Sequence, residues 1–508
     1  RNGFGIRLNR LNVQWVTNGQ LSYSKNWSDV HHFSALAGAE ANGQNRREQR
    51  ISASNFPLDD LRQIGTIANE NTQADEARFE RNTLSYFGQA SYDFDYRYYF
   101  STSVRRDASS LFGGDVNSET FYALGAGWAF SEEKWLQADW LSFAKLRASY
   151  GLTGNSRIGT YTARGLYRFD TDLGYGDLVG LAPSSAPNDR LTWEREDKLN
   201  FGLDLSLWNS RVDLTVEHYV ETTRDAISTI PVPLESGFTT IVANFGDMRN
   251  RGWEITLNTN NLEGQLRWST TFTGAWNRNT VLRLLTENIP GGFNARGLRE
   301  GEDVNTLFGI RYAGVDPYNG KALYYLPDGS ITDDQREAAA VENRVPIGRS
   351  VPIISGGLIN NFGYRGLSLS FLMQYNYGQD IIIDALTLTD GNQIDFNNQS
   401  VDQLYRWQQP GVLTDTRRLH ARNPVTRNST RFLFDASHIR LANLQLSYQL
   451  PQPWLELLRM RKLQLNAQVD NLFYLYTTTA EQGRNSVAEY RFLFPKARTW
   501  SFGINIGL

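Results

Sequence analysis

Cysteine is absent from the 508-residue chain. This absence excludes disulfide bonds, thiolate metal sites and cysteine nucleophiles, and it leaves the redox compartment open. The chain also lacks any run of about 18 consecutive apolar residues, which excludes a membrane-spanning helix. An excess of positive charge is missing as well, because 51 Lys and Arg are balanced by 54 Asp and Glu, so nucleic acid is not expected as a partner.

Motifs for catalysis are equally scarce. The chain has neither H-E-x-x-H nor G-x-S-x-G, and the glycine-rich stretch GAGWAF at 125–130 lies in an alternating segment rather than before a helix. Ser437 adjoins His438, but neighbouring side chains on a strand point to opposite faces, so this pair cannot share a proton. The sequence therefore predicts no enzyme, no catalytic residue and no cofactor.

Strict alternation of apolar and polar residues is the dominant pattern. In LRASYG (146–151), Leu146, Ala148 and Tyr150 fall on one side of an extended chain, and Arg147, Ser149 and Gly151 fall on the other. The same period of two recurs at 212–217, 367–377 and 463–470, and the last residues alternate likewise at 502–508. A mean hydropathy of −0.46 with 13% aromatic residues fits strands in which only every second side chain meets lipid. A soluble sheet with one wet face would show the same alternation.

The connections between these segments come in two sizes. Short turns are predicted at 93–97, 209–210, 260–264 and 362–366, and long polar loops at about 41–80, 171–192, 278–305, 315–350 and 379–436. In an up-and-down membrane barrel, tight turns gather at the periplasmic rim and long loops at the outer rim. Aromatic side chains crowd around the 93–97 turn, where an interfacial girdle would place them. The pattern favours an all-β fold, a large antiparallel transmembrane β-barrel with long extracellular loops and short periplasmic turns.

Eight motifs in a fixed order extend this prediction. They lie at 86–113, 145–159, 191–227, 244–257, 344–358, 406–411, 435–451 and 470–473, with KLRASYGLTGNSRIG as the second. Together they resemble the C-terminal part of the SusC/RagA family of TonB-dependent outer-membrane transporters. The resemblance implies a barrel of about 22 strands, of which residues 1–508 supply about 14 to 17. The family's signal peptide, N-terminal carboxypeptidase-like domain, TonB box and plug have no counterpart in this sequence and are expected elsewhere.

The function implied by the resemblance is nutrient uptake across the outer membrane of a Gram-negative bacterium. A SusD-like surface lipoprotein would act as a lid, and TonB–ExbB–ExbD would supply energy through the missing N-terminal part. Outer-membrane lipid is the implied surroundings, and oligosaccharides, with peptides next, are the implied substrates. Two alternatives stay open: a passive porin or structural barrel, and a soluble β-rich carbohydrate-binding protein.

Substrate contacts are predicted in the long segment 379–436. Aromatic rings there would stack on a sugar, and amide or carboxylate groups would bond its hydroxyls. The candidates are Tyr405, Trp407, Asn392, Asp395, Asn397 and Asn398. For Trp407, packing within its own loop is the favoured interpretation.

An acidic turn is the only candidate cation site. Asp328, Asp333 and Asp334 in YLPDGSITDD (325–334) offer oxygen ligands for a hard cation, but they lack the spacing and closing Glu of an EF-hand. A solvated acidic turn is therefore the favoured interpretation, and no metal site is predicted.

Overall fold

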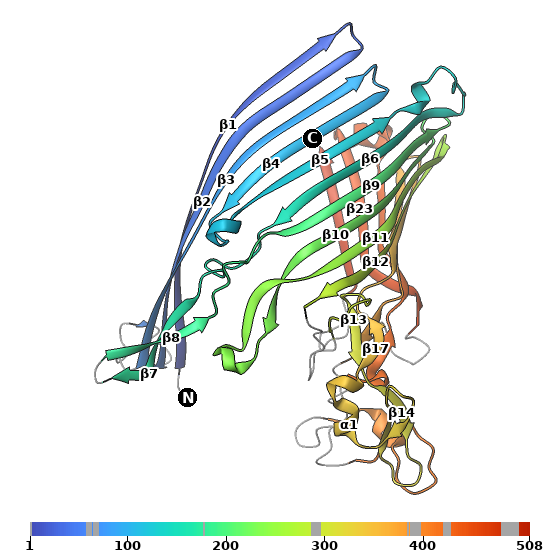
Figure 1. The fold of residues 1–508 in the computed structure, drawn as a ribbon. Helices are drawn as coiled ribbons and strands as arrows, with labels where there is room; N and C mark the ends of the chain where they lie inside the picture. Colours follow the sequence, from blue (N-terminus) through green and yellow to red (C-terminus); the bar gives the residue numbers. More distant parts are fainter. Residues whose placement is uncertain are drawn as a thin grey trace. The chain divides into compact units, whose positions relative to one another are not determined.

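The computed structural model describes residues 3–56, 63–64, 71–175, 178–285, 296–383, 386, 398–419, 428–478 and 497–507. Almost all of its regular structure is β (Figure 1). Within these ranges, no helix combines the length and the apolar character that crossing a membrane would require.

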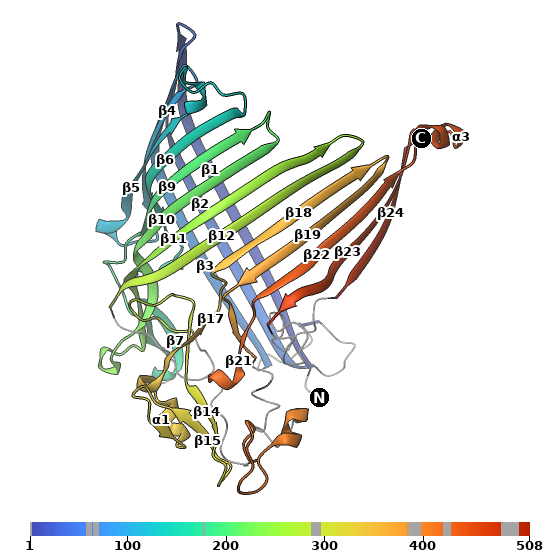
Figure 2. The same cartoon turned by 90° about the vertical axis from the view of Figure 1, so that its right-hand side faces the viewer.

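Fifteen strands form one sheet in which the strand order follows the chain order. The strands are β1 (Gly3–Trp27), β2 (His31–Phe56), β3 (Thr72–Phe94), β4 (Tyr98–Ser109), β5 (Ser118–Trp128), β6 (Leu141–Asn155), β9 (Glu194–Leu207), β10 (Val212–Pro231), β11 (Thr240–Glu263), β12 (Leu266–Leu284), β18 (Ile354–Tyr364), β19 (Leu367–Tyr377), β22 (His438–Gln449), β23 (Lys462–Thr477) and β24 (Thr499–Gly507). Strands β1 to β5 pair antiparallel, as do β12, β18, β19, β22, β23 and β24 (Figure 2). The prediction of an all-β chain with about 14 to 17 barrel strands is confirmed.

The chain divides into two compact units. Unit 1 comprises residues 1–128, 148–199 and 222–247, and unit 2 comprises residues 129–147, 200–221 and 248–508. Unit 1 contains β1 to β5 and the hairpin of β7 (Leu166–Tyr175) and β8 (Leu178–Ser185). Unit 2 contains β12, the strands from β18 onward and most of the long-loop structure.

The short turns lie where the sequence predicted them. Asp95 and Tyr96 connect β3 to β4 with φ of 53° and 55°, and Arg365 and Gly366 connect β18 to β19 with φ of 45° and 86°. Positive φ at both central residues gives the turn a twist that matches the twist of the flanking strands. This geometry keeps each hairpin in a single register, as the unbroken pairing of β18 with β19 shows.

The predicted long loop at 41–80 is wrong. Strand β2 continues to Phe56 and β3 starts at Thr72, so the two strands pair over most of the predicted loop. The prediction failed because polar residues occupy both faces of these two strands, so apolar and polar residues do not alternate along the chain. Polar residues are instead linked across the pair. Gln49 donates to Glu76, which it faces, at 3.0 Å, and Arg47 donates to the same carboxylate diagonally at 2.7 Å.

Long segments of unit 2 fold into a small structure of their own, which we call the loop cluster (residues 296–353, 378–383, 398–419 and 428–437). Its elements are β13 (Thr306–Gly309), β14 (Arg311–Val315), β15 (Ala322–Tyr325), β16 (Ile331–Thr332), α1 (Gln335–Ala339), β17 (Val345–Arg349), β20 (Asp380–Ile382) and β21 (Leu433–Asp435). Leu307, Ile382 and Phe432 pack into one apolar core, and Ile310 and Tyr324 belong to a second. The predicted loops at 315–350 and 379–436 are therefore partly ordered β-structure.

Candidate functional site

The sheet of unit 1 has one apolar face and one hydroxyl-bearing face. Phe33, Tyr92, Phe100 and Leu124 line a hollow of about 510 Å³, and alternate residues of the same strands line another of about 560 Å³. The polar side chains that face the second hollow are Ser22, Ser24, Ser34, Gln89, Ser91, Ser101, Ser103 and Ser149. Ser34 Oγ lies 2.6 Å from Ser91 Oγ across β2 and β3. The two faces thus separate side chains as the predicted alternation requires.

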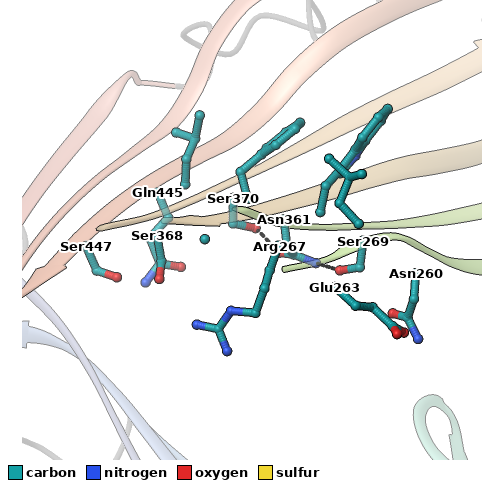
Figure 3. Close-up of a pocket in the computed structure, with 14 residues that line it drawn as sticks. Asn260, Glu263, Arg267, Ser269, Asn361, Ser368, Ser370, Gln445 and Ser447 are labelled. Carbon is teal, nitrogen blue, oxygen red and sulfur yellow. Dashed lines mark hydrogen bonds between the residues drawn. The ribbon is translucent and has the colours of Figure 1, made fainter. Parts of the chain in front are cut away.

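The sheet of unit 2 repeats this separation with larger polar groups. Figure 3 shows the hollow, whose polar lining comes from Asn260, Glu263, Arg267, Ser269, Asn361, Ser368, Ser370, Gln445 and Ser447. Ser370 Oγ donates to Asn361 Oδ1 at 2.7 Å, joining β19 to β18. On the opposite face, the rings of Trp268 and Phe362 stack with centroids 5.6 Å apart. The polar wall offers donors and acceptors to a passing solute but pairs no nucleophile with a base.

The C-terminal strands follow the same rule. Leu463 and Leu465 of β23 pair with Ile506 and Ile504 of β24, whereas Gln464 pairs with Asn505. Leu465 and Ile504 are 43% and 64% exposed, so no second sheet covers them. The apolar and polar sides predicted for 463–470 are confirmed.

An ion-pair cluster lies on the polar face of unit 2. Arg147 of β6 donates from Nε to Asp204 Oδ2 at 2.6 Å and from Nη2 to Glu217 Oε1 at 2.9 Å. Thr215 Oγ1 donates to Asp204 Oδ1 at 3.2 Å. The bidentate guanidinium therefore fixes β6, β9 and β10 in register. This position also explains the register of 212–217, which keeps Glu217 away from the apolar face.

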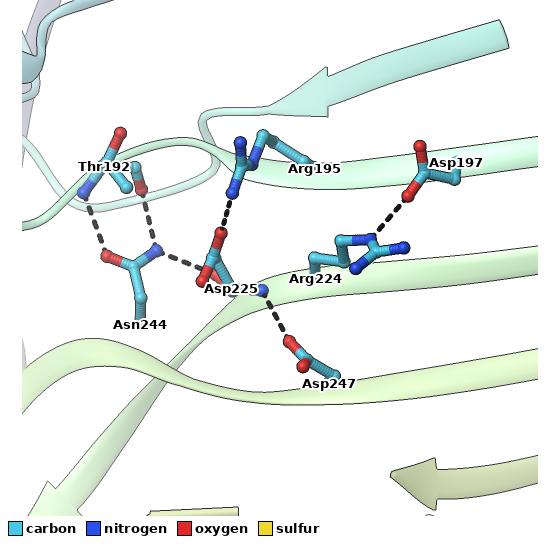
Figure 4. A network of polar contacts seen from close by, with 7 residues as sticks. All are labelled: Thr192, Arg195, Asp197, Arg224, Asp225, Asn244 and Asp247. Carbon is cyan, nitrogen blue, oxygen red and sulfur yellow. Dashed lines mark hydrogen bonds and ion pairs between the residues drawn. The ribbon is translucent and has the colours of Figure 1, made fainter. Parts of the chain in front are cut away.

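A second polar network anchors the base of a long loop in unit 1 (Figure 4). Asn244 Oδ1 accepts from the Thr192 backbone N at 3.0 Å, and Asn244 Nδ2 donates to the Thr192 and Asp225 carbonyl oxygens at 3.0 and 2.8 Å. Arg195 pairs with Asp225, and Arg224 Nε donates to Asp197 at 2.6 Å. The network holds the neighbouring Trp193 in place.

Trp193 belongs to a small apolar core in unit 1. Its ring centroid lies 5.0 Å from that of Phe112 and 5.5 Å from that of Phe121, and Leu191 is fully buried beside them. Aromatic rings at these separations add to the stabilisation from burial alone. The base of the loop before β9 is therefore packed into an apolar core with residues of β5 and of the segment before it.

The structure describes three of the six predicted substrate residues. Trp407 Nε1 donates to the Pro317 carbonyl oxygen at 2.8 Å, and its ring covers Gly320, where an added Cβ would lie 2.4 Å from the ring. Trp407 thus packs two segments of the loop cluster together. Tyr405 is 75% exposed and Asn398 is also exposed. Asn392, Asp395 and Asn397 lie outside the described residues.

Exposed apolar side chains that the sequence reasoning missed lie on the segments that Trp407 joins. Tyr318 and Leu413 are 79% and 87% exposed. Gly411 N donates to the Pro317 carbonyl oxygen at 2.8 Å, and Thr414 Oγ1 donates to the Tyr405 carbonyl oxygen at 2.6 Å. These bonds tie the chain next to Tyr318, Tyr405 and Leu413 into one structure. Pro-Gly at 410–411 is a turn signal, but no local pattern indicates that the segments around Pro317 and Gly411 meet.

Tyr312 contacts the segments of the loop cluster that carry Leu413 and Arg431. Its hydroxyl donates to the Asp415 carbonyl oxygen at 2.8 Å, and the Arg431 guanidinium lies 5.3 Å from its ring centroid. Burial raises the pKa of Tyr312 to about 12, because the phenolate would be poorly solvated. The residue therefore stays neutral at physiological pH.

The acidic turn does not gather its carboxylates. Asp333 pairs with Lys321 at 2.5 Å, and Asp334 caps α1 by accepting from Arg336 N at 2.8 Å. Hydrogen bonds from Ser330 lower the pKa of Asp328. Nowhere in the described ranges do three or more His, Cys, Asp or Glu side chains form a group suited to a metal ion. Each of these carboxylates has a partner of its own.

Ser437 and His438 are also separate. Ser437 Oγ accepts from Gly378 N at 3.0 Å, whereas His438 Nδ1 lies 2.8 Å from the Ala436 carbonyl oxygen. The two side chains therefore serve different parts of the backbone, in line with their predicted opposite directions.

A long antiparallel sheet with one apolar face, one polar face, short turns at one end and long loops at the other is the architecture of a transmembrane barrel. Comparison with known protein families shows which family of barrels the chain belongs to. Residues 1–472 match the family described as TonB dependent receptor-like, beta-barrel, and the chain belongs to that family. Proteins of this family reside in the outer membrane of Gram-negative bacteria, as predicted. Membership removes the soluble alternative.

Similar proteins agree with this assignment. TonB-dependent receptor P39 of Formosa agariphila is 29% identical over 505 residues, which cover 89% of this chain and 48% of P39. SusC of Bacteroides thetaiotaomicron is 32% identical over 213 residues, or 40% of this chain and 21% of SusC. The structure of the RagAB peptide transporter matches with a TM-score of 0.86 at 27% identity, over 99% of this chain and 57% of that chain. The predicted SusC/RagA resemblance is confirmed.

The chain spans about half the length of the curated relatives that match most of it. The strands and loops described above therefore correspond to about half of each of these relatives.

Proposed function

We propose that the chain is the barrel portion of an importer that takes up polar oligomers across the outer membrane. The observation that carries the proposal is the polar wall of unit 2, where hydroxyl, amide and guanidinium groups of Ser368, Asn361 and Arg267 face one hollow. Such groups exchange hydrogen bonds with a solute that carries many donors and acceptors. Oligosaccharides and peptides share this chemistry, and likeness to a peptide transporter supports the second.

Energy and capture would come from outside this chain. The outer membrane maintains no ion gradient, so TonB–ExbB–ExbD would act through a plug in the remaining part of the receptor. A SusD-like lipoprotein would close over the long-loop end. Tyr318, Tyr405 and Leu413 are suited to contact such a lid or the solute beneath it, because exposed apolar side chains on an ordered base favour association.

Uptake by cells that carry the full-length receptor tests the proposal. Labelled oligosaccharide and peptide mixtures should enter cells with the wild-type gene and remain outside cells that lack the gene or lack TonB. Uptake that persists without TonB would instead identify a passive porin, the remaining alternative.

Variants on neighbouring residues locate the path. Ser368→Trp combined with Ser370→Trp places two indoles on the polar wall and should reduce uptake at least tenfold. Leu369→Trp inserts the same ring on the opposite face and should leave uptake within twofold of wild type. Equal uptake by both variants, at equal amounts of folded receptor in the outer membrane, would contradict transport along this wall.

A further inference from the structure

The hollow on the apolar face of unit 1 has the form of a ligand site. Its floor consists of small side chains, Ala90, Thr102, Ala126 and Ala148, contributed by four strands. Larger side chains surround this floor, namely Phe33, Tyr92, Phe100, Leu124, Tyr150 and Leu199. Its volume of about 510 Å³ falls in the range of small-molecule sites. Because it lies on the face that meets hydrocarbon, its occupant must be apolar.

Strand register fixes the height of the hollow. Trp27, His31, Phe94, Tyr98 and Trp128 face one another across β1 to β5 and form a row of rings beside the short turns. Such rows mark the membrane–water interface, and the short turns face the periplasm. The floor of the hollow occupies the next two rows toward the strand centres. Two residues span roughly 6.6 Å along a strand, so the hollow lies just inside the hydrocarbon of the inner leaflet.

The rows that β1 to β5 contribute beside the hollow carry a positive group and no carboxylate. On the β6 and β9 side, the hydroxyl of Tyr150 donates to Asp197 at 3.1 Å, and Arg224 pairs with that carboxylate. Lys25 pairs with Phe33 one row from the interface, and its Nζ lies 5.4 Å from the Trp27 ring centroid. His31 Nδ1 lies 2.7 Å from the Tyr92 hydroxyl on the wall of the hollow. Three rows run across β1 to β5. The row at the interface consists of Trp27, His31, Phe94, Tyr98 and Trp128, and the second row consists of Lys25, Phe33, Tyr92, Phe100 and Ala126. The third row consists of Tyr23, Ala35, Ala90, Thr102 and Leu124. A cation at headgroup height complements a phosphate.

We propose that this hollow binds one acyl chain of an anionic glycerophospholipid of the inner leaflet, whose phosphate pairs with Lys25. Burial of a chain in the hollow gains no hydrophobic free energy relative to the bilayer, because lipid tails are as apolar as the site. Selectivity must therefore come from the fit between the aromatic walls and from the charge of the headgroup. The inference does not depend on the substrate that the receptor imports.

Native mass spectrometry of the full-length receptor in detergent tests the site. With phosphatidylglycerol and phosphatidylcholine of identical chains added in turn, wild type should retain one phosphatidylglycerol at least tenfold more strongly than phosphatidylcholine. Equal retention of both lipids would overturn the proposal. A dimer that forms with no lipid retained would identify a second copy of the chain as the occupant and would overturn it as well.

Three variants assign the roles. Ala90→Phe combined with Ala126→Phe fills the floor and should abolish retention of the bound lipid. Lys25→Gln should lower phosphatidylglycerol retention to the phosphatidylcholine level while leaving the latter unchanged. Ala37→Phe adds the same ring on the same face beyond the hollow and should behave as wild type. Heat-modifiable migration on gels reports folding, and lipid retention by a folded double variant would refute the site.

Discussion

The loop cluster and the sheet of unit 2 are stabilised in different ways. In the loop cluster, Phe308, Tyr324 and Phe432 are at most 1% exposed, as in a water-soluble domain. In β24, by contrast, Phe502 and Ile504 are 78% and 64% exposed. The cluster therefore depends on apolar burial, whereas the strands depend on backbone pairing and on lipid as the apolar partner. The comparison shows that the exposed fraction of a side chain indicates its contribution to stability in the loop cluster, which water surrounds, but not in strands that face lipid.

The largest expected effect is loss of a core ring in the loop cluster. Phe432→Ala should destabilise the cluster by roughly 3–5 kcal/mol, because the cavity adds to the lost transfer free energy. Phe502→Ala should cost far less, since its ring faces lipid and its removal leaves no cavity in a protein core. Hydrogen exchange of the two regions in the folded receptor measures both effects. Equal protection losses would contradict the distinction.

A charge placed on neighbouring residues tests the two faces directly. Leu124→Arg should destabilise the folded barrel by up to roughly 2–4 kcal/mol, the penalty at the bilayer midplane, because Leu124 lies two rows inside the interface on the face that meets lipid. Ala123→Arg alters the adjacent residue, which lines the hydroxyl-bearing hollow, and should be tolerated. Urea unfolding of the receptor in lipid vesicles compares the pair. A larger penalty for Ala123→Arg would reverse our assignment of the faces.

Two glycines of the loop cluster test the packing of Trp407. Gly320 and Gly329 both have positive φ, of 71° and 89°, but an added Cβ contacts Trp407 at Gly320 and nothing within 4 Å at Gly329. Gly320→Ala should therefore cost roughly 1–3 kcal/mol more than Gly329→Ala, because it adds overpacking to the shared backbone strain. Limited proteolysis near residue 413 reports the difference. Matching cleavage rates would show that Trp407 is not a packing residue.

The smallest expected effect concerns pH. Burial raises the pKa of Asp380, whose carboxylate accepts from Arg349 N at 2.9 Å. Because the folded pKa lies above the unfolded pKa, the group favours folding most at low pH. This contribution is lost as the pH rises above about 4, the ordinary pKa of an Asp side chain, and through the raised pKa of the folded protein. Asp380→Asn keeps an acceptor and removes the titration. Hydrogen exchange of β20 and β21 is measured at pH 4 and pH 7 and corrected for the intrinsic exchange rate. In wild type the protection should differ between the two pH values, and in Asp380→Asn it should be the same at both.

The faces of the strands could be predicted from the sequence because lipid contact requires an apolar side chain at every second residue. Lipid on one side and water on the other force alternation, so Leu463 and Gln464 were assigned to opposite faces without a structure. The rule ends where the strands leave the membrane, and there the β2–β3 pairing around Arg47 was predicted as a loop. Pairing between facing polar residues depends on register, which the local pattern does not contain.

The candidate site was less accessible to sequence reasoning. The indole of Trp407 finds its acceptor at Pro317, 90 residues away. The polar wall likewise draws Arg267, Asn361 and Gln445 from strands far apart in the chain. Alternation predicts which way each side chain points, but only folding shows which of them share a hollow. The hypothesis of substrate contacts in 379–436 remains a prediction.

The length of the β2–β3 hairpin has a further consequence. Strand β3 has 23 residues, whereas about 9–11 suffice to cross the hydrocarbon. At about 3.3 Å per residue the remaining ladder extends up to roughly 40 Å past the bilayer. Because such a projection stands clear of the lipid, a short epitope grafted at its outer end would be accessible to antibody on intact cells.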